Sequence, residues 1–187
     1  MSRIAGLLLA AGSGRRFGGP KALADTGHGP WVLRALEVLG QCDPRIVVVG
    51  ARGDEVAALL PPEVTVVSNP DHPTGMASSL RAGLSRLPAD ADAVLVTLVD
   101  LPDISVAVAA RVLAAACPDP RVALARAVFS GRAGHPVLIG RRHIAGLLEW
   151  MAGAGPDTGA GGYLAEHCAR RIDCSDLADG RDRDTTE

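Results

Sequence analysis

The chain has 187 residues, a formal net charge of −2, 48% hydrophobic residues and 3% aromatic residues. A chain of this length buries enough surface for one hydrophobic core without disulfides or a structural metal, so we predict a single domain over residues 1–187. The net charge near zero and the scarcity of aromatic side chains argue against a nucleic-acid-binding protein.

Four cysteines, none of them in a C-x-x-C pair, are spread along the chain: Cys42, Cys117, Cys168 and Cys174. This spacing predicts neither a zinc knuckle nor a disulfide framework and favours a reduced, cytoplasmic protein. Arg15 and Arg16 follow the first apolar run instead of preceding it, which is the wrong charge order for a secretory signal. No stretch reaches the roughly 18 uninterrupted apolar residues of a membrane span, so no membrane partner is expected.

Short apolar runs bounded by polar residues or breakers predict five buried strands, at residues 4–10, 45–50, 64–68, 93–99 and 121–128. Between them, apolar residues at three- and four-residue spacing predict helices with one buried face, at residues 31–39, 54–60, 77–87 and 105–116. The alternation indicates an α/β fold, a Rossmann-like domain with a mostly parallel sheet and helices on both faces.

The pattern changes in the last third of the chain. Residues 130–140 predict a turn into a strand, residues 141–151 a helix, and a Gly-rich loop then precedes a short helix and a last strand around 171–174. The tail from about residue 176 has little to bury. In open parallel sheets, ligands bind beyond the carboxyl ends of the strands where strand order reverses. The residues after the first, third and fourth strands are therefore the first candidates for a site.

Residues 7–23 read LLLAAGSGRRFGGPKAL, an apolar strand that runs into glycines, two arginines and a lysine. Three phosphate-binding templates compete for this loop. The Walker A template G-x-x-x-x-G-K-[ST] fails, because Pro20 separates the last glycine from Lys21 and Ala22 stands where a magnesium-binding hydroxyl is needed.

A dinucleotide-binding loop fits this segment better. Three glycines, Gly12, Gly14 and Gly18, give G-x-G-x-x-x-G directly after a strand. Arg52, beyond the second strand, could meet a 2′-phosphate. No acidic residue ends that strand, however, and the only tyrosine, Tyr163, lacks the lysine four residues on that short-chain reductases carry.

The third template is L-A-A-G-x-G-x-R followed by P-K. Its glycines let backbone N–H groups approach phosphates, while Arg16 and Lys21, the only lysine of the chain, offset charge that grows on a departing pyrophosphate. We therefore name Arg16 and Lys21 as candidate catalytic residues. The predicted nucleotide-binding residues are Leu9, Ala10, Ala11, Gly12, Ser13, Gly14, Arg15, Arg16 and Lys21.

The fourth predicted strand runs straight into Asp100. An aspartate at the carboxyl end of a central strand suits Mg²⁺, which favours carboxylate and phosphate oxygens together. A turn or N-cap aspartate is the alternative, although Asp103 and Ser105 lie nearer the start of the next predicted helix. Asp100 is a candidate metal ligand and catalytic residue.

Residues 74–84, TGMASSLRAGL, predict a second anion site. The segment enters a helix with free backbone N–H groups, two hydroxyls and an arginine one turn in, where the helix dipole favours negative charge. An ordinary serine N-cap explains one serine but not the whole run. The candidate acceptor-binding residues of this segment are Gly75, Met76, Ser78, Ser79 and Arg81.

Four motifs, in this order, resemble the MobA-like family of nucleotidyltransferases, and within it the molybdenum cofactor cytidylyltransferase branch. They are LAAGSGRRFGGPK (9–21), PTGMASSLRAGL (73–84), VDLPDI (99–104) and GHPVLIG (134–140), with DRDT (182–185) as a weaker fifth. Together they span nearly the whole chain. The second motif favours the cytidylyl branch over the guanylyl branch.

The resemblance implies a single Rossmann-like domain in which the molybdopterin phosphate attacks the α-phosphorus of a nucleoside triphosphate, CTP being favoured, and releases pyrophosphate. It also implies Mg²⁺ as cofactor, with Asp100 as principal ligand and Asp184 as second ligand, so that catalysis is mostly positioning and charge stabilisation. A recipient molybdoenzyme is an implied partner. Other bases, and sugar-phosphate or phospholactate acceptors, stay open within the same reaction class.

His135, in the fourth motif, has two interpretations. Its place in the family motif implies that it orients the acceptor, whereas a turn histidine before proline is the plain physical alternative. Two departures from the family pattern bear on the acceptor and the metal. Gly161 stands where the family loop has an arginine, and the acidic tail motif ends as DRDTTE. Outside the transferase class, an NADP-dependent reductase and a catalytically silent nucleotide-binding module remain as alternatives.

Overall fold

The computed structural model describes residues 2–154 and 159–183, so Asp184, the predicted second metal ligand, lies outside the described residues. One sheet runs through this part of the chain in the strand order β3-β2-β1-β4-β6-β5-β7. The strands are β1 (Ile4–Ala10), β2 (Arg45–Val49), β3 (Thr65–Ser68), β4 (Ala93–Leu98), β5 (Leu124–Phe129), β6 (Arg132–Gly140) and β7 (Arg170–Asp173). Among these strands only β6 runs antiparallel to its neighbours, which confirms the predicted mostly parallel sheet.

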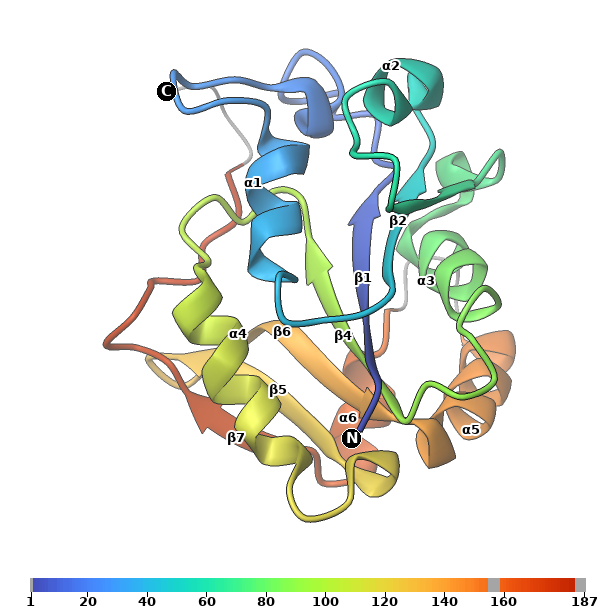
Figure 1. Cartoon of the computed structure of the whole chain (residues 1–187), viewed down its shortest axis with the longest axis vertical. Coiled ribbons are helices and arrows are strands. Elements are labelled where there is room, and N and C mark those ends of the chain that lie inside the picture. Colours follow the sequence, from blue (N-terminus) through green and yellow to red (C-terminus); the bar gives the residue numbers. More distant parts are fainter. Residues whose placement is uncertain (1, 155–158, 184–187) are drawn as a thin grey trace.

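Helices cover both faces of this sheet, as Figure 1 shows. The α-helices are α1 (Trp31–Val38), α2 (Gly53–Ala57), α3 (Met76–Leu84), α4 (Val106–Leu113), α5 (Arg141–Gly153) and α6 (Gly161–Glu166). The 3-10 helices are η1 (Lys21–Leu23), η2 (His72–Thr74), η3 (Ala114–Ala116) and η4 (Pro120–Val122). Buried side chains of α1 and α4 form one core cluster with the sheet, and those of α3, α5 and α6 form the second. The predicted Rossmann-like α/β class is thereby confirmed.

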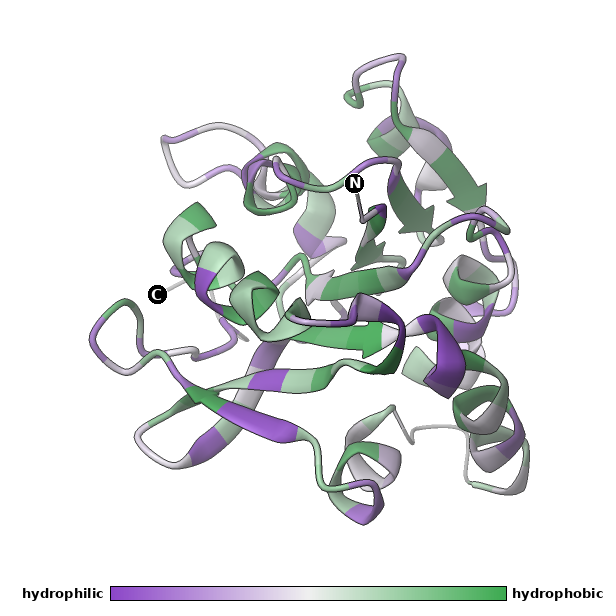
Figure 2. Cartoon of the chain, turned by 60° about the horizontal axis from the view of Figure 1, so that its bottom comes forward, coloured by the Kyte–Doolittle hydropathy of each residue, from purple (hydrophilic) through white to green (hydrophobic). Residues whose placement is uncertain are grey.

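The apolar content of the central strands explains their place in the sheet. Six of the seven residues of β1 are buried, because a strand flanked by two parallel neighbours and covered by helices on both faces has no solvent side. Figure 2 shows hydrophobic residues concentrated on these strands and hydrophilic ones on the surrounding loops and outer helix surfaces. Among the described helices, none is long and apolar enough to cross a membrane.

Strand β5 begins later than predicted. The sequence predicted a strand from residue 121, but residues Pro120–Val122 form η4, in which the Asp119 carboxylate accepts a hydrogen bond from Arg121 N at 2.9 Å. The side-chain cap and the proline at the start of this turn outweigh the apolar pattern, so the ladder starts at Leu124.

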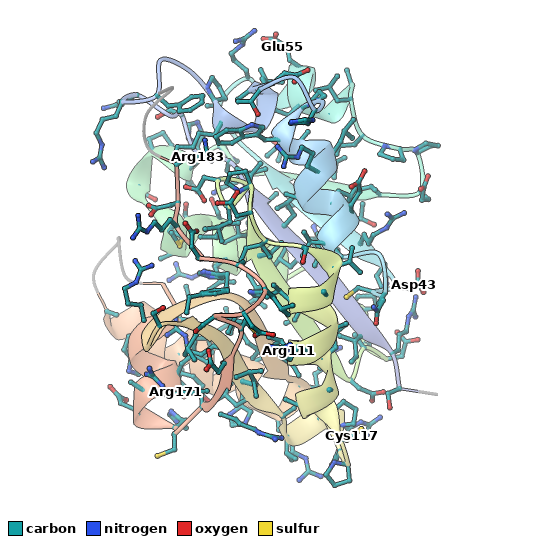
Figure 3. All side chains as sticks on the ribbon, turned by 90° about the vertical axis from the view of Figure 1, so that its left-hand side faces the viewer. Asp43, Glu55, Arg111, Cys117, Arg171 and Arg183 are labelled. Carbon is teal, nitrogen blue, oxygen red and sulfur yellow. The ribbon has the colours of Figure 1, made fainter. Side chains whose placement is uncertain are left out.

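The tail after β7 runs back along the molecule toward the carboxyl ends of β1 and β4. Leu177 and Ala178 pack against the core, although the sequence predicted little burial in this segment. Asp176 forms an ion pair with Arg111 on α4, and Arg183 N donates to Asp100 O at 3.1 Å. Figure 3 shows Arg183 at the end of this path, far above Arg111 and Arg171. The described tail therefore ends beside Asp100, two residues after β4.

Candidate functional site

A cavity of about 590 Å³, hereafter the main cavity, opens at the carboxyl ends of β1 and β4. Its position is the point where strand order reverses, since β2 lies on one side of β1 and β4 on the other. Val99 N donates to Leu9 O at 3.2 Å, so the two strand ends are fixed against each other. The lining comprises Leu9, Ala11, Gly12, Ser13, Gly14, Arg15, Arg16, Phe17, Lys21, His72, Pro73, Gly75, Met76, Ser79, Leu98, Val99 and Asp100.

The loop after β1 closes on itself around Gly14. Gly14 has φ +56°, and a Cβ there would lie 1.9 Å from Gly19 O, so only glycine allows this path. Phe17 N and Gly19 N both donate to Gly14 O, at 2.9 and 3.1 Å. The Phe17 ring packs on Trp31 of α1 with ring centroids 5.2 Å apart. These contacts fix a glycine-rich rim on which Arg15 and Arg16 are exposed.

Lys21 and Asp100 form an ion pair across the floor of the main cavity. Lys21 Nζ lies 3.1 Å from Asp100 Oδ2, and the two side chains are only 12% and 25% exposed. Arg34 of α1 steadies the segment after Asp100, because its guanidinium donates to Pro102 O at 3.1 Å. A partly buried pair of this kind holds one positive and one negative group ready for a charged ligand.

The described residues fit a hard divalent cation through Asp100. Mg²⁺ is commonly held by one or two carboxylates together with substrate phosphates, and Asp100 supplies one carboxylate within a cavity that has phosphate-binding groups on its rim. Within the described residues no group of three or more His, Cys, Asp or Glu side chains could hold a metal. Arg183 N donates to the main-chain oxygen of Asp100, so the last described residue lies beside Asp100.

The start of α3 forms another wall of the main cavity. Gly75 precedes the helix with φ +121°, a conformation that L side chains rarely adopt. Met76, 44% exposed, and Ser79 also face the cavity. Three of the predicted acceptor-binding residues, Gly75, Met76 and Ser79, therefore line the main cavity. Their role in binding an acceptor stays a prediction.

Asn69, which sequence reasoning missed, organises this wall. Its buried Nδ2 donates to Ser78 Oγ at 2.9 Å and to Ser79 Oγ at 3.0 Å, and its Oδ1 accepts from Asp71 N at 3.1 Å. Both serine hydroxyls are thus engaged in holding the turn before α3. The available signal was position, because Asn69 follows β3 directly.

Four predicted site residues of the described chain lie outside the lining of the main cavity, namely Ala10, Ser78, Arg81 and His135. Ala10 points into the core and is 1% exposed. Ser78 and Arg81 line a separate hollow, where the Arg81 guanidinium lies 3.4 Å from Met151 O of α5. His72 and Phe17, by contrast, line the main cavity although the sequence did not single them out.

A second cavity of about 140 Å³, hereafter the side cavity, adjoins the main cavity and shares Leu9 and Met76 with it. His135 of β6 lies here. Burial, together with the nearby charge of Arg126, lowers the pKa of His135 to about 4, so the imidazole is neutral at pH 7. The remaining lining consists of Leu80, Val96, Arg126, Val137, Ile139, Gly159, Ala160, Gly161 and Leu164.

Arg52 and Tyr163, the two side chains weighed for the dinucleotide-binding alternative, line neither cavity. The Arg52 guanidinium is exposed and paired with Glu55, with Arg52 Nε 2.6 Å from Glu55 Oε1. Tyr163 is buried, stacks on His167 with ring centroids 3.9 Å apart and contacts His143 Nδ1 at 3.3 Å through its hydroxyl. The structure thus brings neither side chain to the glycine-rich loop.

Residues 6–170 match the family model described as the MobA-like NTP transferase domain. A curated relative from Paenarthrobacter nicotinovorans, named nicotine blue oxidoreductase, is 36% identical over 203 residues, which cover 98% of this chain and 93% of the relative.

Solved structures with the same fold include two mycobacterial proteins. The crystal structure of a Mycobacterium tuberculosis rv0371c homologue from Mycobacterium sp. strain JC1 is 26% identical, with a TM-score of 0.81, and the match covers 98% of this chain and 91% of that chain. The Rv0371c complex with manganese from M. tuberculosis H37Rv is 22% identical, with a TM-score of 0.69 and coverage of 92% and 88%.

Proposed function

The chain belongs to the MobA-like NTP transferase family, and we propose that it moves CMP from CTP onto the phosphate of molybdopterin and releases pyrophosphate. The observation that carries the proposal is the main cavity, in which the glycine-rich loop, Lys21 and Asp100 meet at the switch point of the sheet. A recipient molybdoenzyme is the proposed destination of the product.

In this proposal the triphosphate lies along the loop after β1. Backbone N–H groups around Gly12 and Gly14 bind phosphate oxygens, and Arg16 and Lys21 bind the β- and γ-phosphates. When the triphosphate enters, Lys21 exchanges part of its interaction with Asp100 for the phosphates. Its charge then stabilises the pyrophosphate as it departs.

The acceptor lies on the side of Gly75, Met76 and Ser79. One oxygen of its phosphate forms a bond to the α-phosphorus of CTP, and the bond from the α-phosphorus to the bridging oxygen breaks, so that pyrophosphate leaves with the electron pair. Asp100, with Asp184 as the proposed second ligand, would hold Mg²⁺, which neutralises phosphate charge and favours in-line displacement when bound. The protein's share of catalysis is positioning and charge stabilisation.

The test is a transfer assay with each of the four α-labelled nucleoside triphosphates, molybdopterin, and Mg²⁺ or Mn²⁺. We expect labelled dinucleotide and stoichiometric pyrophosphate with CTP, and much less with GTP, ATP or UTP. Transfer from another triphosphate at the same rate would overturn the base assignment. Triphosphate binding without any pyrophosphate release would indicate a catalytically silent nucleotide-binding module instead.

A reductase is the second candidate, and the observation that favours it is the 36% identical relative named as an oxidoreductase. In that case the main cavity would hold NADH or NADPH, with its pyrophosphate on the loop after β1. Fluorescence titration with both cofactors and spectrophotometric reduction of a redox dye test this directly. Tight NADPH binding together with dye reduction, and no CMP transfer, would establish the reductase.

A further inference from the structure

Arg126, on β5, is an unexplained charged residue at the side cavity. Its Nε is buried without a hydrogen-bond partner in the described structure, and its guanidinium contacts Gly134 O at 3.3 Å. None of the motifs that carry the family resemblance includes it. Because most buried polar atoms in folded proteins are hydrogen-bonded, an orphan donor of this kind calls for a partner.

The described residues that line the side cavity offer Arg126 no counter-charge. Arg126 and His135 are the only titratable side chains among the described lining residues, and the rest are apolar side chains, alanine or glycine. His135 is neutral at pH 7, and no carboxylate lines the cavity within the described residues. Desolvation lowers the pKa of Arg126, with a further contribution from the charge of Arg171. A negative or strongly electron-rich ligand atom would accept a hydrogen bond from Arg126 Nε and balance the charge of the guanidinium.

Strand alternation sets the direction of the Arg126 side chain. Its neighbours Ala125 and Ala127 belong to the core cluster of α1 and α4, so Arg126 faces the other side of the sheet, where the side cavity lies. Gly161 also lines the side cavity, and a Cβ built there would meet nothing within 4 Å, so the space beside this residue is open. The side cavity therefore stays open in front of Arg126.

The size of the side cavity matches one aromatic ring. Its volume of about 140 Å³ is close to the ~150 Å³ of an apolar cavity that binds benzene. Leu9 and Met76 line both cavities, so a ring in the side cavity would lie next to a ligand in the main cavity.

We propose that the side cavity is a specificity subsite for the acceptor, taking a planar ring that carries an oxyanion or carbonyl oxygen, and that Arg126 donates from Nε to this oxygen. That the ring belongs to the acceptor rests on the proposed transferase function. That the side cavity takes a ring with an oxygen is argued from the side cavity alone. Neutral His135 bounds the same ring without adding a second positive charge.

Benzoate tests the subsite without any transfer reaction. Nuclear magnetic resonance of the histidine rings, with His135 assigned from a His135→Gln variant, should show saturable shifts of His135 on benzoate addition. Toluene, which lacks the oxygens, and inorganic phosphate, which lacks the ring, should each bind at least about tenfold more weakly. The absence of benzoate-induced shifts at His135, or equal binding of toluene, would overturn the proposal.

Variants of Arg126 have a matched control in Arg171, its register partner on β7, which is exposed and lines neither cavity. Arg126→Gln should weaken benzoate binding at least about tenfold, Arg126→Lys should weaken it less, and Arg171→Gln should leave it unchanged. Thermal unfolding of each variant checks that the fold is intact. Equal losses from Arg126→Gln and Arg171→Gln would show a general charge effect and contradict the subsite.

The transfer assay separates this proposal from the proposed function. With molybdopterin and CTP, Arg126→Gln should raise KM for the acceptor about tenfold and leave KM for CTP within about twofold of the wild-type value. A wild-type enzyme that transfers nothing would refute the transferase function, while the benzoate titration would still decide the subsite. A change confined to KM for CTP would refute the subsite alone.

Discussion

The main cavity and the side cavity share Leu9 and Met76 but differ in how their charged groups are supplied. In the main cavity a short loop contributes several basic and glycine residues, and Lys21 already has a carboxylate partner in Asp100. In the side cavity Arg126 is the only charged side chain among the described lining residues, beside neutral His135, and it lies three strands away from that loop. The first arrangement suits a highly charged ligand that brings its own cation, and the second suits a ring with one polar edge.

The largest effect should come from removing the carboxylate of the main cavity. Asp100→Asn should lower kcat more than about a hundredfold, because the amide is a much weaker ligand for Mg²⁺ than the carboxylate. Asp103→Asn is the matched control, since Asp103 is exposed and lies outside the main cavity. Steady-state transfer assays at saturating Mg²⁺ measure the effect, with circular dichroism as the check on folding. Near-normal turnover of Asp100→Asn would remove Asp100 from the metal site.

The next largest effect should come from removing the positive charge of Lys21 in the main cavity. Lys21→Gln should raise KM for CTP about ten- to a hundredfold, because a charged donor to the triphosphate is lost. Arg52→Gln removes the same charge at a site paired with Glu55, and it should leave KM for CTP unchanged. The pair of variants also distinguishes the two candidate functions. Loss of NADPH affinity in Arg52→Gln would favour the dinucleotide arrangement.

The difference between the cavities also explains what the sequence could predict. The loop after β1 is contiguous, and its glycines and basic residues stand at fixed spacing, so its place beside Asp100 follows from parallel strands ending at one edge of the sheet. Arg126 lies inside a strand with an apolar pattern, and the cavity in front of it is lined by residues of β1, β4, β6, α3 and α6 that are distant in the sequence. Asn69 was detectable from its place after a strand, whereas its hydrogen bonds to the two serines depend on how α3 packs.

The lowered pKa of His135 in the side cavity should make the free energy of unfolding depend on pH. The folded protein keeps His135 neutral down to about pH 4, whereas a histidine in the unfolded chain takes up a proton near pH 6.5. Stability is therefore lost as pH falls from about 6.5 toward 4, by about 2 kcal/mol at pH 5 relative to pH 7. Urea unfolding at both pH values should show this loss in the wild type and a correspondingly smaller one in His135→Gln. Equal losses in both proteins would show that His135 is not held neutral.

The smallest effect should come from substituting Arg81. This variant compares a residue of α3 that lines neither cavity with the residues of the same helix that do. Although the sequence placed Arg81 with the acceptor-binding residues, its guanidinium lies beside Met151 O and lines neither cavity. Arg81→Gln should therefore change KM for CTP and for the acceptor by less than about twofold. Met76→Ala, five positions earlier on the same helix, removes a side chain shared by both cavities and should raise KM for the acceptor more than Arg81→Gln does. The reverse order would place acceptor binding in the hollow beside α5 instead.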